Sequence, residues 1–276
     1  MHPGARGASE RGTPKVHLVI ASGGGDINAK SSHNGTVHDE SLTRHYGDAM
    51  ELREALRTTH AVRSFSDQPV SREIVVEILD DARFAPSGGN RQAWHVIVVE
   101  DAARRQGLRD LYLDGWHDYI AHMMAGLVPF SPLASDADRA AARAQRANAE
   151  AASRPDGFPE TLDHVPCLLV VTADLGVLAA LDRDLDRYNL VGGASIYPFV
   201  WQILLAAKDR GLGGVMTTMA TASEPAVQEL LQIPSHHAVA AVVALGYPAT
   251  TLSKLTRRAV SDFTTIDTFD GDALSL

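Results

Sequence analysis

Three groups of polar residues in this chain have types and spacings that suit the binding of a ligand. The first is the segment SGGNRQ, residues 87–92, which stands between an apolar helical pattern and an apolar strand pattern. Its two glycines permit a tight turn or the close approach of another molecule. Ser87, Asn90 and Gln92 offer hydrogen-bond donors and acceptors without charge. The set suits the edge of a planar heterocycle, although a helix end capped by polar side chains has the same composition.

The other two groups are basic, and one precedes this loop while the other lies in the polar tail of the chain. A guanidinium suits phosphate because its planar fork donates two parallel hydrogen bonds. Taken alone, each group also fits an ordinary solvated surface. Together with the neutral loop, the two groups fit a phosphorylated heterocycle. They consist of Arg57, His60 and Arg63, and of Lys254, Arg257 and Arg258.

Other chemistries find little support in the residue pattern. No serine, histidine and aspartate are spaced as a hydrolytic triad, so we expect no catalytic side chain of that kind. The adjacent His236 and His237 cannot share one face of a helix, so we expect no metal site there. Cys167, the only cysteine, lies in the apolar run VPCLLVV and is interpreted as a core thiol rather than a nucleophile.

Helices and strands must position these groups, and the hydrophobic periodicity indicates where they lie. We expect an α+β fold, because helical and strand patterns are mixed without regular alternation. A helix begins at Asp48, which together with Glu51 resembles a capping box, and Ala55, Leu52 and Leu56 form its apolar face. Ser71 caps the next helix. The further helices are expected at 108–124, 135–154, 190–210 and from Ser223 to Ile233, and the strands at 94–99, 165–172 and 238–245.

Residues 1–48 differ in composition from the rest of the chain. They are rich in Gly, His, Ser and Asn and mostly lack periodicity, which predicts a disordered or non-native extension that contacts no cofactor. The run VHLVIASGGGDIN within it is not interpreted as a dinucleotide loop, because Asn28 stands where that motif needs a third glycine. The folded domain is expected over 49–276, with a polar tail over 249–276.

The overall composition restricts the class of protein further. Apolar residues make up 45% of the chain, which is enough for a packed core, and the formal net charge is −9. A nucleic-acid partner is not expected at this charge. No run is long and apolar enough to span a membrane, and no signal peptide is visible. With a single cysteine, the expected location is the cytoplasm.

Several motifs in consecutive order resemble the FMN-dependent nitroreductase family. The segment THAVRSF, residues 59–65, is similar to the family pattern R-R-S-[IV]-R-x-F, and APSGGNRQAW, residues 85–94, to A-P-S-x-x-N-x-Q-P-W. Gly-Leu-Gly at 211–213, Gly-Tyr-Pro at 246–248 and the arginine pair at 257–258 follow. The resemblance covers roughly residues 50 to 270. It implies a central, mostly antiparallel sheet flanked by helices, and a homodimer with FMN at its interface.

The resemblance also implies roles for individual residues. Arg63, with Arg257 or Arg258, would hold the FMN phosphate, and the 87–92 loop would line the flavin or its ribityl chain. The backbone from Gly213 to Thr218 would face the isoalloxazine ring. The expected cofactor-binding residues are His60, Ala61, Arg63, Ser87, Asn90, Gln92, Gly213, Gly214, Thr217, Thr218, Arg257 and Arg258.

The chemistry implied by the resemblance resides in the cofactor. NADH or NADPH would give a hydride to flavin N5 and leave, and an electron-poor acceptor, such as a nitroarene or a quinone, would then take its place. A family member with another flavin reaction (dehalogenation, desaturation or flavin cleavage), or one that binds flavin without turnover, remains an alternative. The insertion at about 114–166 is expected to form a lid, whose aromatic residues either stack on the substrate or pack in the core or dimer: Trp116, Tyr119, Phe130 and Phe158.

Two features qualify these expectations. Thr59, His60 and Ala61 stand where the family pattern has two arginines and a serine, so a guanidinium and a hydroxyl are missing and weaker FMN retention is expected. The helix predicted from Leu190 is apolar nearly all round, which one domain of this size cannot cover. A two-fold symmetric homodimer would bury its remaining face.

Overall fold

The computed structural model describes residues 50–250 and 255–275 of the chain, and the fold is built on four antiparallel strands. Their order in the sheet is β1-β2-β4-β3, so β1 and β3 form the two edges. The predicted α+β class and antiparallel sheet are therefore confirmed. The strands are β1 (Trp94–Val98), β2 (Cys167–Asp174), β3 (Gly213–Thr217) and β4 (His237–Gly246).

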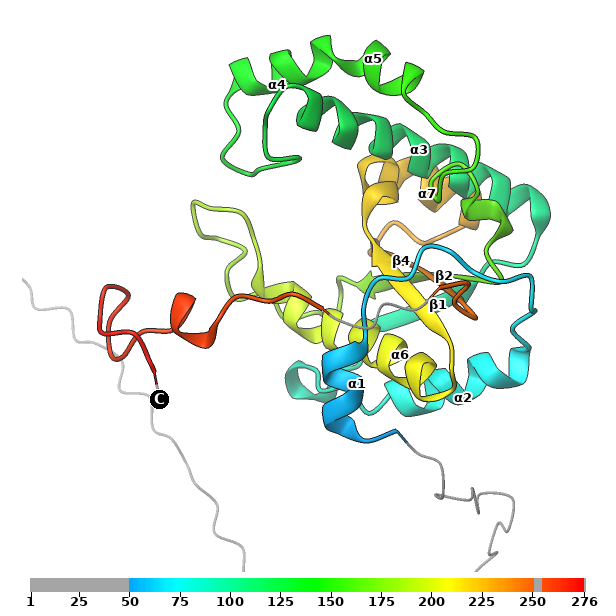
Figure 1. The fold of residues 1–276 in the computed structure, drawn as a ribbon, viewed down its shortest axis with the longest axis horizontal. Coiled ribbons are helices and arrows are strands. Elements are labelled where there is room, and N and C mark those ends of the chain that lie inside the picture. The colour runs from blue at the N-terminus through cyan, green and yellow to red at the C-terminus, as the bar shows by residue number, and fades with distance from the viewer. Residues whose placement is uncertain (1–49, 251–254, 276) are drawn as a thin grey trace, which may run out of the picture. The chain divides into compact units, whose positions relative to one another are not determined.

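Helices cover both faces of this sheet (Figure 1). One layer consists of α1, α2 and α6, and the other of α3 and α7, with α4 and α5 packed on α3. The bounds are α1 (Leu52–Thr58), α2 (Arg72–Ala82), α3 (Ala102–Met124), α4 (Asp136–Ala144), α5 (Arg146–Ala151), α6 (Tyr197–Asp209) and α7 (Glu224–Leu231). Short 3₁₀ turns are η3 (Gly88–Asn90), η4 (Leu162–His164), η5 (Val191–Ser195), η6 (Met219–Ser223) and η7 (Val260–Asp262).

The alternation of side chains along the central strands divides the core into two clusters. Leu169 and Val171 of β2 face the layer of α2 and α6, whereas Leu168 and Val170 face the layer of α3 and α7. All four side chains are fully buried. Because both faces of β2 are covered, its sequence is continuously apolar rather than alternating. Cys167 lies in the first cluster, and burial raises the pKa of its thiol to about 11, which confirms a core thiol.

The second predicted helix is confirmed in detail. Ser71 caps α2 by accepting a hydrogen bond from the Ile74 amide at 3.4 Å. Val75, Ile78 and Ala82 are buried along one face. In α1, by contrast, only Ala55 is buried. The prediction that Leu52 and Leu56 pack with it in the core is wrong for the single chain, because both are more than half exposed. Asp48, its predicted cap, lies outside the described residues, as does the predicted extension 1–48.

The helix predicted over 190–210 begins seven residues later than expected, at Tyr197. Val191–Ser195 form a 3₁₀ turn instead, because Gly192 and Gly193 favour helix poorly. Pro198 fits the first turn of α6, where no amide donor is needed. Tyr197 and Trp201 remain about 40% exposed, so the single chain leaves part of this helix uncovered, as expected from its apolar sequence.

Other boundaries differ for local reasons. Helix α3 begins at Ala102, six residues before the predicted start, because Asp101 caps it by accepting from the Arg104 amide at 2.9 Å. The predicted helix 135–154 is divided at Gln145 into α4 and α5. Ser223 precedes α7 but makes no side-chain cap. Strand β3 was not predicted, because two of its five residues are glycines, which are depleted in strands.

Candidate flavin-binding site

The segment that contains Arg63 lies along the free side of edge strand β3. Ala61 forms a parallel bridge with Gly214, and the Val62 amide donates to the Gly214 carbonyl at 2.9 Å. Further along, Phe65 bridges to Pro248 beyond the end of β4. Residues 60–66 together with 213–218 are called the Arg63 edge below. The structure thus brings together seven of the predicted site residues: His60, Ala61, Arg63, Gly213, Gly214, Thr217 and Thr218.

Gly213 and Gly214 are buried in this edge, and packing explains why they lack side chains. A Cβ atom at Gly213 would lie 2.6 Å from Val62 Cγ2, and one at Gly214 would lie 2.7 Å from the Ala244 carbonyl oxygen. Neither distance is compatible with van der Waals radii. The two glycines therefore allow the Arg63 segment to approach β3 closely, whatever they contribute to a cofactor.

Arg63 itself is exposed, and it makes no ion pair with any residue in the described part of the chain. It lines a cavity of about 690 Å³ with Phe158, Thr161 and His164 from the predicted lid. His60 is half-buried, and its Nδ1 lies 2.9 Å from the Thr58 carbonyl oxygen. A guanidinium at a polar cavity can bind an anionic group of a ligand by donating hydrogen bonds to it.

Tyr112 of α3 joins the Arg63 edge to the helical layer, and the sequence pattern does not single it out. Its hydroxyl lies 3.3 Å from Thr217 Oγ1, and its ring meets that of Phe158 edge-to-face at 6.2 Å. Burial raises the pKa of Tyr112, while the positive charge of Arg63 opposes that rise. In the sequence Tyr112 lies within a predicted helix and carries no motif, so only the structure indicates its proximity to Arg63.

The loop of residues 87–92, called the Ser87 loop below, is held in an unusual backbone conformation. Gly89, Asn90 and Gln92 have φ angles of 62°, 52° and 49°. For Asn90 and Gln92 the left-handed region costs energy and persists only where surrounding contacts impose it. Two hydrogen bonds of 3.0 Å do so, from the Gly88 amide to Ser195 Oγ and from the Gln92 amide to Ser87 Oγ.

The loop thus displays neutral polar side chains from a backbone held by hydrogen bonds. The side chains of Asn90 and Gln92 are exposed, and Gln92 Nε2 donates to Asn90 Oδ1 at 3.1 Å. Ser195, which was missed because it lay inside a predicted helix, is buried and anchors the loop from η5. The strained loop and its exposed amides favour ligand recognition over simple capping of a helix end.

The Arg63 edge and the Ser87 loop lie at opposite edges of the sheet. The Ser87 loop leads into β1 at one edge, and its neighbour Ala93 accepts from the Asp174 amide at 2.7 Å. The Arg63 edge flanks the other edge strand, β3. Three strand spacings of ~4.8 Å separate the two edges. Within the residues described, no hydrogen bond or ion pair connects these two groups.

The two tail arginines lie apart from both groups in their contacts. Arg257 donates to the carbonyl of its neighbour Thr256 at 2.7 Å, and Arg258 lies 5.8 Å from the ring centroid of Phe263. Both are exposed, and neither forms an ion pair with the residues that are described. Lys254, the third member of this basic group, is outside the described residues.

With this geometry established, comparison with known proteins gives the class. A model of the nitroreductase family matches residues 56–247, so this chain belongs to the nitroreductase family. It is 26% identical over 222 residues to nitrobenzene nitroreductase of Ectopseudomonas oleovorans, covering 78% of this chain and 96% of the relative. It is also 26% identical over 216 residues to an NADH dehydrogenase of Thermus thermophilus, covering 72% and 88% respectively.

Among solved structures, a similar fold occurs in oxidised iodotyrosine deiodinase bound to FMN and 3-iodo-L-tyrosine. The TM-score is 0.54 at 20% identity, and the match covers 79% of this chain and all of the deiodinase chain. The chain is thus an oxidoreductase of the nitroreductase family by its sequence, and a nitroreductase-like α+β protein by its fold. No helix among the described residues is long and apolar enough to cross a membrane.

Proposed function

We propose that this chain is an FMN-dependent oxidoreductase that uses NADH or NADPH to reduce an electron-poor acceptor of the nitroarene or quinone type. The observation that carries the proposal is a pair of polar groups: Arg63, which lines a polar cavity and has no ion pair among the described residues, and a strained loop that displays Asn90 and Gln92. The names of two family relatives, a nitroreductase and an NADH dehydrogenase, support the donor and the acceptor class.

The residues present suit FMN. Arg63 would hold the phosphate, with Arg257 or Arg258 closing over it, and the Ser87 loop would bind the polar edge of the flavin or its ribityl chain. Ser195 and Ser87 keep the loop's backbone in place, so the backbone loses little freedom on binding. Bound FMN supplies hydride transfer, which the protein's own side chains cannot perform.

Thr59, His60 and Ala61 replace two arginines and a serine of the family pattern, and this difference limits FMN binding. Thr59 is buried with its hydroxyl bonded to the Ala55 carbonyl at 2.7 Å, so it cannot replace a phosphate-binding guanidinium. His60 can contribute a positive charge only when it is protonated. We therefore expect FMN to dissociate more readily from this protein than from a relative with the full arginine pair.

A complete site requires two copies of the chain. Because the Arg63 edge and the Ser87 loop lie at opposite edges of the sheet, one FMN can contact both only if a partner subunit supplies one of them. The surface carries apolar side chains that a partner could cover. They are concentrated after β2 and along α6: Leu175, Val177, Leu181, Leu185, Tyr188, Leu190, Val191, Tyr197 and Trp201.

A second candidate reaction is another flavin chemistry, with dehalogenation the favoured example. The fold is shared with a deiodinase, and the motifs of the Arg63 edge and the Ser87 loop concern the flavin rather than the second substrate. A member that binds flavin without turnover is the remaining alternative, and the altered segment Thr59-His60-Ala61 favours it.

A flavin assay separates these alternatives. The purified protein, or the protein with added FMN, should show the absorbance of bound flavin, and anaerobic NADH or NADPH should bleach it. Reoxidation is then followed with a nitroarene, a quinone and a haloarene in parallel. Protein that ignores excess FMN would refute the proposal, bleaching without reoxidation by any acceptor would indicate another substrate, and the absence of bleaching would indicate a non-catalytic member. Light scattering should give the mass of two chains.

A further inference from the structure

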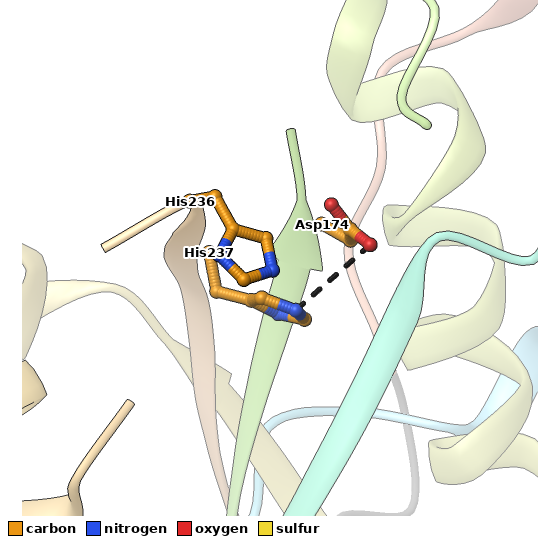
Figure 2. A group of neighbouring side chains, drawn as sticks. All are labelled: Asp174, His236 and His237. Carbon is orange, nitrogen blue, oxygen red and sulfur yellow. Dashed lines mark ion pairs between the residues drawn. The ribbon is translucent and has the colours of Figure 1, made fainter. Parts of the chain in front are cut away.

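A second, separate cluster of side chains lies where β2 ends and β4 begins. Asp174, His236 and His237 each offer one ligand atom, and these atoms all lie within 4.8 Å of one another. Figure 2 shows the two imidazole rings beside the carboxylate, with the ion pair between His237 Nε2 and Asp174 Oδ2 at 4.0 Å. The three residues belong to neither the Arg63 edge nor the Ser87 loop.

The local backbone explains how adjacent histidines converge. His236 lies in the turn that precedes β4, and His237 is the first residue of that strand, so helical geometry does not apply to them. Their ring centroids are 4.8 Å apart. The antiparallel register places Asp174 directly opposite His237, and the Leu175 amide donates to the His236 carbonyl at 2.9 Å. The strand ends therefore hold the cluster.

Each of the two half-buried members is oriented by a further contact. Thr172 Oγ1 lies 3.0 Å from His237 Nδ1, which leaves Nε2 directed at the carboxylate. Asp174 Oδ1 accepts from the Gly176 amide at 2.8 Å, which leaves Oδ2 for another partner. Metal-binding sites have the same arrangement, in which an outer hydrogen bond fixes the ring and the carboxylate. His236 is exposed, so an ion can enter from solvent.

We propose that Asp174, His236 and His237 form a binding site for a zinc-class divalent cation at the junction of β2 and β4. Two imidazoles and one carboxylate are a typical ligand set for Zn²⁺, and solvent would complete the tetrahedral shell. Imidazole ligands favour Zn²⁺, Ni²⁺ and Cu²⁺ over Mg²⁺, which prefers oxygen. The site would tie the end of β2 to the turn before β4, next to the backbone bond between Asp174 and Ala93 that follows the Ser87 loop.

The test is a calorimetric titration of the full chain with zinc chloride, together with thermal melting. His236→Ala removes an exposed ligand without disturbing the core. Asp174→Asn removes the charge but retains an oxygen for the Gly176 amide. Each should weaken zinc binding by more than about tenfold, because even the loss of an outer-shell partner has that effect. His164→Ala, an exposed histidine outside the cluster, is the matched control and should bind like the unaltered chain.

The chain carries other histidines that could bind zinc weakly. The result is therefore decided by the difference in zinc affinity and melting shift between the variants and the unaltered chain. Zinc should raise the melting temperature of the unaltered chain and of His164→Ala, and this rise should be absent in His236→Ala and Asp174→Asn. Magnesium chloride should have no effect in any of the four proteins. Identical zinc stoichiometry, affinity and melting shift in the unaltered chain and in His236→Ala would overturn the proposal. Flavin content does not enter these readouts, so the result is independent of the proposed oxidoreductase activity.

Discussion

The Arg63 edge and the Ser87 loop differ in the side chains that they offer to a ligand and in the contacts that hold their backbones. At the Arg63 edge, two buried glycines let a chain segment bridge to β3, and the charged side chain projects from a packed support. In the Ser87 loop the backbone is strained, the side chains are neutral, and single hydrogen bonds to Ser195 and Ser87 maintain the shape. The first region should therefore depend on steric fit, and the second on individual polar contacts.

The largest difference should appear in FMN affinity when one arginine of each region is removed. Arg63→Ala should weaken FMN binding by about 10- to 100-fold, because a hydrogen bond to a charged group contributes ~1.5–3 kcal/mol. Arg91→Ala in the Ser87 loop removes an exposed side chain and should change affinity little. Flavin fluorescence titration measures both. Equal losses would show that the phosphate is held elsewhere.

Substitution of glycine should separate the two regions by stability. Gly214→Ala forces a Cβ against the Ala244 carbonyl oxygen and Leu245 Cδ2, which should destabilise the fold by ~1–3 kcal/mol. Gly88→Ala places its Cβ 3.4 Å from Ser195 Oγ at an unstrained φ, and should be neutral or slightly stabilising. Urea denaturation of both variants provides the comparison. A Gly214→Ala protein as stable as the parent would mean that the Arg63 segment is loosely packed.

A smaller effect is expected when the anchor of the Ser87 loop is removed. Ser195→Ala leaves the Gly88 amide without its acceptor and should cost ~1 kcal/mol of stability. FMN affinity should also fall, because the displayed amides lose their fixed geometry. Ser235→Ala, an exposed serine outside both regions, is the matched control. If both variants retain full affinity, the loop does not need Ser195 to adopt its binding conformation.

Acid should destabilise the Ser87 loop before the Arg63 edge. The loop is anchored by Ser195 of η5, and Asp182 holds the start of η5. Asp182 accepts from the Leu190 and Val191 amides and pairs with Arg187, and these contacts lower its pKa to about 2. A carboxyl with a lowered folded-state pKa contributes stability above its unfolded pKa of ~3.9 and loses it as pH falls towards 2. Thermal melts from pH 5 to pH 2 should therefore decline less steeply for Asp182→Asn than for the parent. Parallel curves would mean that these contacts are not maintained in solution.

The smallest effect is expected at the N-terminus. A chain that begins at Met50 retains both regions, and the Met50 nitrogen donates to Asp209 Oδ1 at 2.9 Å, a contact that a free amino group can also make. FMN affinity and melting temperature should stay close to those of the full chain. A tenfold loss of affinity would show that residues before Met50 contribute to the site.

The sequence alone determined most of the local structure that supports the site. The capped helix α2, the apolar strands β1, β2 and β4, and the buried Cys167 follow from periodicity and capping, which act over a few residues. The motifs around Arg63 and Ser87 were sufficient to indicate the family, which the family model confirms. Strand β3 escaped prediction because its glycines are selected by contact with residues far away in the chain rather than by local propensity.

Only the tertiary structure decided which residues meet. It joined Arg63, Tyr112 and Thr217 from three separate elements, and it placed the Ser87 loop at the opposite edge of the sheet. It also brought Asp174 to His236 and His237, for which helical geometry had predicted no metal site. The physical reason is that strand order and register are set by the burial of both faces of the sheet, a property of the whole core that no short stretch of sequence contains.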